Sequence, residues 1–122
     1  MRPRHQLLPA LLLAAPLLAG CADGGGLVDG ATSGPPAKGV TQVVVRQTRF
    51  SPAAIQVPAD TRVTWIFQDG DVPHDVEGDG WSSGKPQASG TFSHAFDQAG
   101  IYDYACTLHP RMTGRIVVTA AP

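Results

Sequence analysis

Three residues that can donate a sulfur or nitrogen atom to a metal recur at every third position near the end of the sequence. They are Cys106, His109 and Met112, in the segment Tyr-Ala-Cys-Thr-Leu-His-Pro-Arg-Met-Thr-Gly. A thiolate, an imidazole and a thioether are ligands that suit soft and borderline metal ions. A second histidine, His74, lies in a loop rich in glycine, aspartate and proline that follows the apolar run 63–67. The pattern predicts one metal site built from two loops.

The donor set discriminates between metals. Two histidine nitrogens, one cysteine sulfur and a long bond to methionine are the ligands of blue-copper electron-transfer sites. Structural zinc sites use four strong donors, and a thioether is a poor ligand for zinc. We therefore expect one mononuclear copper ion with the ligands His74, Cys106, His109 and Met112.

Residues 1–20 have the composition of an export signal. Two arginines precede an apolar run from Leu7 to Leu18, and small residues follow directly before Cys21. This arrangement is typical of secretory signal peptides. The end of the segment resembles the bacterial lipobox, in which the cysteine becomes the lipidated N-terminus, so we expect a lipid anchor on Cys21. The alternative is an ordinary secretory signal in which Cys21 is incidental.

Residues 21–39 would follow as a lipidated cysteine and a flexible tether, because they contain six glycines and two prolines and no apolar periodicity. The chain has two cysteines in all. If Cys21 carries lipid, Cys106 has no disulfide partner in an exported protein, where a free thiol is reactive. Metal ligation accounts for Cys106, and an inert buried cysteine is the alternative.

From Val40 onward, short runs of β-type residues alternate with turn residues, and no stretch keeps helical periodicity. We expect an all-β domain over residues 40–122, a two-sheet antiparallel Greek-key sandwich of about seven or eight strands. Tyr104 and Cys106 lie two positions apart on one strand, so the cysteine sulfur should point inward. The segment 68–90 is rich in Gly, Asp, Pro and Ser, and it predicts a long surface connection.

The chain from about Phe50 to Val118 resembles the plastocyanin-like cupredoxins. It resembles the amicyanin-like group in particular, whose ligand loop has the same Cys-x-x-His-x-x-Met spacing. The resemblance implies a two-sheet β sandwich with one type 1 copper and a function in one-electron transfer. It implies the ligands His74, Cys106, His109 and Met112.

Three residues depart from the pattern of that family. Asp60 replaces the glycine that usually follows Pro-Ala, which predicts a strained or differently shaped turn. Asp75 replaces the Asn, Thr or Ser that often follows the first ligand, which leaves open the usual hydrogen bond to the ligand loop. His94 shares its face with apolar neighbours, and we interpret it as a half-buried, hydrogen-bonded side chain, with an auxiliary metal ligand as the alternative.

The leading interpretation is an electron carrier, and the alternative is a copper-binding or delivery lipoprotein, which needs an exchangeable metal. A copper enzyme requires a further catalytic site with several more histidines, and His94 alone is spare after the signal, so we expect no enzyme activity. All ten acidic residues follow Cys21, so nucleic acid is not an expected partner. We expect a monomer that serves redox proteins at the outer face of a bacterial membrane, toward the periplasm or the exterior.

Two surface features predict how a redox partner would approach. Electron exchange is expected at the edge of the His109 ring, inside an apolar patch formed by Leu108, His109, Pro110 and Pro73. A run of acidic residues surrounds His74 in the sequence and would attract a basic partner surface. These possible docking residues are Asp69, Asp71, Asp75, Glu77 and Asp79. The alternative is a solvated acidic loop without a partner.

Overall fold

The computed structural model describes residues 34–122, and the predicted signal segment and Cys21 lie outside these residues. Within residues 34–122 no helix is long and apolar enough to cross a membrane. The strands are β1 (Ala37–Lys38), β2 (Gln42–Arg46), β3 (Arg49–Ser51), β4 (Ala54–Pro58), β5 (Arg62–Gln68), β6 (Glu77–Gly78), β7 (Trp81–Ser82), β8 (Ser89–Ala95), β9 (Gly100–Ala105) and β10 (Thr113–Thr119).

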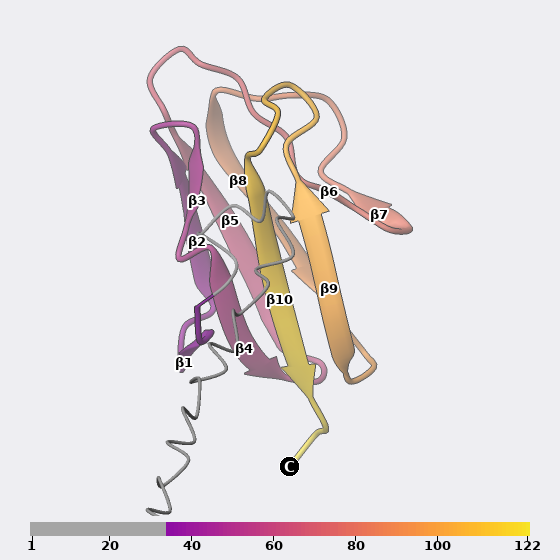
Figure 1. Cartoon of the computed structure of the whole chain (residues 1–122). Coiled ribbons are helices and arrows are strands. Elements are labelled where there is room, and N and C mark those ends of the chain that lie inside the picture. Colours follow the sequence, from indigo (N-terminus) through magenta and orange to yellow (C-terminus); the bar gives the residue numbers. More distant parts are fainter. Residues whose placement is uncertain (1–33) are drawn as a thin grey trace, which may run out of the picture.

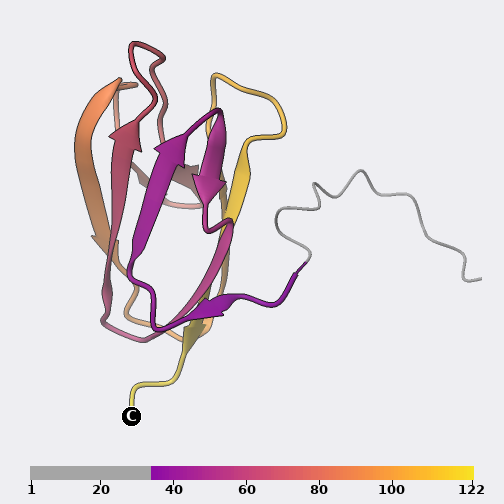
Figure 2. The ribbon, with the colours of Figure 1, turned by 90° about the vertical axis from the view of Figure 1, so that its left-hand side faces the viewer.

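Two sheets pack face to face (Figures 1 and 2). One sheet has the strand order β1-β4-β10-β9-β6-β7, and the other has the order β3-β2-β5-β8. The predicted all-β, two-sheet sandwich is therefore confirmed. The sheets are mixed rather than purely antiparallel, because β10 runs parallel to β4 and β2 runs parallel to β5. These parallel pairs arise where the chain crosses from one sheet to the other, which no local sequence pattern reveals.

Alternate residues of each strand fill the space between the sheets. On β5, Val63, Trp65 and Phe67 are buried, and the residues between them are only half-buried. Tyr104 of β9 meets Trp65 edge to face, with a distance of 5.4 Å between ring centroids. Its burial raises the pKa of Tyr104 above the usual value, so the phenol stays neutral. Cys106 lies two residues further on and points into the same core, as the alternation predicts.

The segment between β5 and β8 differs from the plain surface connection that its composition predicts. β6 and β7 form a short hairpin that extends the first sheet beyond β9. Trp81 on this hairpin turns inward, and its ring lies 5.5 Å from that of Trp65 and 5.1 Å from that of His94. The hairpin thus closes one edge of the sandwich and anchors the chain that follows His74.

Backbone conformation at two other places bears on the sequence predictions. Asp60 has a φ of 67°, in the left-handed region that favours glycine, which agrees with the strained turn expected there. Ala37 and Lys38 lie in the segment predicted to be tether, but they form β1 and pair with Ile55 and Gln56 of β4. The folded domain therefore includes these two residues.

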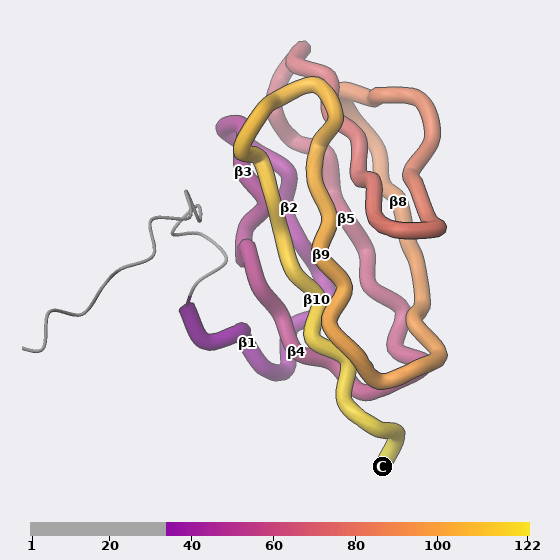
Figure 3. Tube along the Cα trace, turned by 45° about the vertical axis from the view of Figure 1, so that its right-hand side comes forward, coloured from indigo at the N-terminus to yellow at the C-terminus, as the bar shows by residue number. Residues whose placement is uncertain are grey.

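The strands deliver the candidate metal ligands to one end of the sandwich. β9 ends at Ala105, directly before Cys106, and β10 begins directly after Met112. The loop that follows β5 carries His74. Both loops lie together at the upper end of the molecule in Figures 1 and 3. Two rigid strands therefore hold the ends of the loop from Cys106 to Met112.

The fit between β10 and β9 gives a prediction about stability. A Cβ atom added at Gly114 would lie 2.2 Å from the ring of Tyr104, whereas one added at Gly100 would meet only Tyr102 at 3.6 Å. Gly114→Ala should therefore lower the free energy of unfolding by about 1–3 kcal/mol. Gly100→Ala, the matched control on the same strand pair, should change it by less than about 0.5 kcal/mol. Chemical denaturation of both variants measures the difference, and equal effects would contradict the packing argument.

Candidate metal centre

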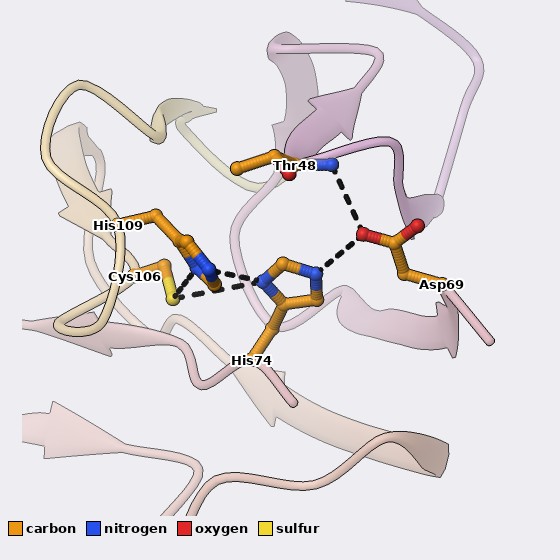
Figure 4. Close-up of polar contacts among 5 residues, drawn as sticks. All are labelled: Thr48, Asp69, His74, Cys106 and His109. Carbon is orange, nitrogen blue, oxygen red and sulfur yellow. Dashed lines mark hydrogen bonds and ion pairs between the residues drawn. The ribbon is translucent and has the colours of Figure 1, made fainter. Parts of the chain in front are cut away.

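The structure brings the side chains of His74, Cys106 and His109 together at the end of the sandwich (Figure 4). Nδ1 of His74 lies 3.2 Å from Nδ1 of His109. The sulfur of Cys106 lies 3.8 Å from the first nitrogen and 3.5 Å from the second. Within the part of the chain that the structure describes, this is the one cluster of histidine, cysteine and acidic side chains with metal-binding spacing.

These distances fit a single metal ion in the middle of the three atoms. The point equidistant from three atoms at such separations lies roughly 2 Å from each, and metal–imidazole bonds measure about 2.0–2.1 Å. The sulfur of Cys106 is in a side chain that is only 4% exposed, so a thiolate there needs a cation beside it. One thiolate and two imidazoles, with methionine nearby, form the donor set that selects copper.

The ligand loop between β9 and β10 is closed by its own backbone. The Cys106 amide donates to the Met112 carbonyl at 2.9 Å, and the Met112 amide donates to the His109 carbonyl at 3.2 Å. Pro110 and Arg111 are the central residues of the turn that the Met112–His109 hydrogen bond closes, and Arg111 has a φ of 73°. Proline before a left-handed residue is the type II turn pattern, although glycine or asparagine is more usual at the second position. This tight turn returns the chain to Met112, directly before β10.

Hydrogen bonds fix His74 from both sides. Its backbone amide and carbonyl both pair with Gln87, at 3.0 and 2.9 Å. Its ring nitrogen Nε2 donates to the carboxylate of Asp69 at 2.7 Å. Because a carboxylate only accepts, the proton must lie on Nε2, and the lone pair of Nδ1 is left free for a metal.

Asp69 is in turn held by a neighbouring hairpin. The same carboxylate accepts a hydrogen bond from the amide of Thr48, in the turn between β2 and β3, at 3.1 Å. The hydrogen bonds from His74, then from the backbone amides of Thr48 and Gln47, lower the pKa of Asp69 below its usual value. Asp69 therefore orients the imidazole, and the sequence did not reveal this role because acidic loops carry no periodic pattern.

Asp75 is also part of the site rather than of the surface. Its side chain is 4% exposed, and its Oδ1 accepts a hydrogen bond from the amide of Thr107 at 2.7 Å. Its Oδ2 accepts a second hydrogen bond from the hydroxyl of Thr107. The link between the His74 segment and the ligand loop, which the sequence left open, is therefore present with a carboxylate as acceptor. Asp75 does not lie where a docking acid was expected.

Met112 and His94 complete the account of the candidate ligands. Met112 is 3% exposed and lies at the end of the ligand loop, and its role as the fourth ligand stays a prediction. His94 is half-buried on β8, stacked on Trp81 and edge to face with Phe96. It lies outside the metal cluster, and among the described residues its side chain has no hydrogen-bond partner.

Exposed apolar residues flank His109 in the sequence and in the neighbouring loop. Leu108 is 45% exposed, Pro110 and Pro73 are exposed, and His109 is half-buried. Val72, which the sequence analysis did not select, is 41% exposed on the neighbouring loop. Of the five acids near His74, three remain exposed, and these are Asp71, Glu77 and Asp79.

An all-β sandwich with a Cys-His-His cluster between two loops at one end is the architecture of a type 1 copper protein. Comparison with known families agrees. A family model described as "Cupredoxin-like domain" matches residues 11–118 of the 122. The chain belongs to the cupredoxin family, and its site is that of one mononuclear type 1 copper ion.

Individual relatives indicate a subgroup. The chain is 31% identical to amicyanin of Paracoccus denitrificans over 121 residues, which covers 87% of this chain and 92% of that protein. It is also 31% identical to amicyanin-alpha of Methylorubrum extorquens over 87 residues, which covers 66% of this chain and 72% of that protein.

Solved structures give the same result. A reduced amicyanin mutant superposes with a TM-score of 0.58 and 31% identity, over 66% of this chain and 83% of the other. A purple cupredoxin from Nitrosopumilus maritimus gives a TM-score of 0.56 and 26% identity, over 66% of this chain and all 100% of the other. The chain is therefore an amicyanin-like blue copper cupredoxin in sequence and in fold.

The contact between Asp69 and His74 leads to a prediction for metal affinity. Asp69→Ala removes the acceptor that keeps the proton on Nε2 and fixes the ring. Copper affinity should fall by about 10–100-fold, the usual effect of losing such a partner. Asp71→Ala is the matched control, because it removes an exposed acid from the same loop and should leave affinity within about twofold. Competition with a chelator of known affinity measures both, and equal effects in the two variants would rule out an orienting role for Asp69.

Proposed function

We propose that this protein carries single electrons between redox proteins. The observation that supports this most directly is the convergence of one buried cysteine sulfur and two imidazole nitrogens within 3.8 Å of one another. Copper bound by such a set supplies a one-electron couple between Cu(II) and Cu(I). The residues of the chain hold that couple in place, exclude water from it and connect it with the surface.

Each ligand residue has a separate role in this proposal. Cys106 supplies the covalent thiolate bond, and Met112 supplies the weak axial donor that such sites use to tune the reduction potential. His74 is 1% exposed, so it anchors the metal on the inner side. His109 is half-buried whereas the other three expected ligands are buried, so its ring would be the shortest path for an electron to the surface. Because both loops are fixed by backbone hydrogen bonds, the geometry changes little between oxidation states.

Delivery of copper to another protein is the second candidate function. It requires that incoming ligands displace every resident ligand, including Cys106 and His74, but these two side chains are only 4% and 1% exposed. A carrier should lose copper to a strong chelator slowly, whereas a delivery protein should transfer it rapidly to a partner. Burial of the two inner ligands favours the electron carrier.

We also propose that a partner docks over His109. The exposed apolar residues there allow close approach without desolvation of charge, and Val72 extends the patch to include Leu108, His109, Pro110, Pro73 and Val72. The exposed acids of the His74 segment would attract a basic partner surface: Asp71, Glu77 and Asp79.

The proposed site of action is the outer face of a bacterial membrane. The export signal in residues 1–20 and the lipobox-like end at Cys21 support an exported protein with a lipid anchor. The glycine-rich residues that follow would let the copper domain reach partners near the membrane.

Oxidised copper protein should show an intense blue absorption, because the Cys106 thiolate donates charge to Cu(II). Cys106→Ser should abolish this band while the domain still folds, since serine fills nearly the same space. His94→Gln is the control, because His94 lies outside the cluster, and it should keep the band. Visible spectra of the copper-loaded proteins test this, and a pale wild-type spectrum typical of nitrogen and oxygen ligands would refute the proposed function.

Electron-transfer rates test the docking surface. Leu108→Asp places a charge in the apolar patch and should slow second-order transfer to a physiological partner by about fivefold or more. A variant with Asp71, Glu77 and Asp79 changed to Asn or Gln should lose most of the dependence of the rate on salt. Rates are measured by stopped flow across ionic strength.

The control for the second variant changes acids at the opposite end of the sandwich. Asp60→Asn with Asp97→Asn alters the net charge in the same direction, away from the ligand loops. This pair should keep the salt dependence. Equal salt slopes in wild type and the loop variant would refute steering, and an unaffected Leu108→Asp would place electron exchange elsewhere.

Mass spectrometry tests the anchor. Native protein should begin at Cys21 and exceed the mass of residues 21–122 by the attached lipid. Cys21→Ser should release the protein from the membrane fraction. A native mass equal to the unmodified chain would indicate an ordinary secreted protein.

A further inference from the structure

Asp75 is a buried acid without a cationic side-chain partner. It is 4% exposed, and the two ion pairs found among residues 34–122 are His74 with Asp69 and Arg115 with Asp103. A buried charge without compensation costs several kcal/mol. A group other than a lysine or arginine side chain must therefore offset the charge of Asp75.

Hydrogen bonds from one residue provide part of the compensation. Both carboxylate oxygens accept from Thr107, one from the backbone amide and the other from the hydroxyl. An asparagine could keep both contacts, because its amide nitrogen can donate to the threonine hydroxyl, which also accepts. Asp75→Asn therefore removes the charge and leaves the link to Thr107 in place.

The position of Asp75 indicates the remaining compensation. It directly follows His74, and Thr107 directly follows Cys106, so the carboxylate lies between the backbones that carry two of the metal ligands. A Cu(II) ion bound to one thiolate has a net charge of +1, and a Cu(I) ion bound to the same thiolate is neutral. A nearby buried negative charge attracts the first and has no such effect on the second.

We propose that Asp75 is a fixed negative charge of the copper site, which stabilises the oxidised form and lowers the reduction potential. This inference rests on the proposed one-electron function. Asp75 also ties the His74 segment to the ligand loop, but the effect on the potential comes from its charge. In this respect the chain differs from one that carries a neutral residue after the first ligand.

The test is a redox titration of the full copper-loaded chain as wild type, Asp75→Asn and Asp71→Asn. Asp75→Asn should shift the equilibrium toward Cu(I) by about tenfold or more, a rise in potential of about 59 mV per tenfold for one electron. Asp71→Asn makes the same chemical change on an exposed residue of the same segment and should shift it by less than about twofold. The blue band should keep its position in all three, because the ligands are unchanged.

The possible results distinguish failure of the proposed function from failure of this inference. A wild-type protein without a blue band would overturn the proposed function and this inference with it. A blue wild type in which Asp75→Asn and Asp71→Asn have equal potentials would overturn the inference alone. A shift in potential that comes with a displaced blue band would also overturn the inference, because a displaced band indicates distorted ligand geometry rather than an effect of charge.

A second variant decides the question if Asp75→Asn does not fold or bind copper. Asp75→Ser removes the charge and puts in its place a smaller side chain whose hydroxyl can still accept from an amide. The potential should rise, as for Asp75→Asn. A potential that stays the same or falls would overturn the proposal.

Discussion

The convergence of three donor atoms at one point is the constraint on which this end of the molecule depends. The Cys106 sulfur and Nδ1 of His74 and His109 lie 3.2 to 3.8 Å apart, close enough to hydrogen-bond when a proton lies between two of them and spaced to hold one metal ion when none does. The backbone must therefore keep the three side chains at this spacing with and without the metal. The paired strands β9 and β10 hold one side, and the bridge between His74 and Gln87 holds the other.

Sequence periodicity predicted the parts of this arrangement that lie on regular strands. The inward direction of the Cys106 side chain was predicted because Cys106 lies two positions after Tyr104 on one strand. The ligand types were predicted from the chemistry of the side chains. The inward turns of Asp75 and Trp81 could not be predicted in this way. Asp75 lies in a loop, where no period relates position to burial, and Trp81 lies on a two-residue strand, which is too short to show alternation.

The acidic run from Asp69 to Asp79 does not form one continuous acidic surface. Counting charges suggests a continuous acidic surface, but Asp69 and Asp75 are both engaged by the site, through His74 and Thr107. These two carboxylates contact residues of the site. Exposed Arg111 also lies in the ligand loop, so the exposed surface near the ligands is less acidic than the sequence implies. An acidic residue of this run thus contacts either the site or the solvent, depending on the course of the backbone.

Backbone strain at the ligand end is consistent with a site that keeps one geometry. Arg111 and Thr48 have left-handed φ values of 73° and 56°, which cost of order 1–3 kcal/mol each. Hydrogen bonds offset this cost at both turns, between Met112 and His109 and between Thr48 and Asp69. His74 cannot leave without breaking two bonds to Gln87. Any opening would have to begin on the His109 side, because His109 is half-buried whereas His74 and Cys106 are buried. Under the proposed docking, the loop that would release copper is the same loop that a partner would cover.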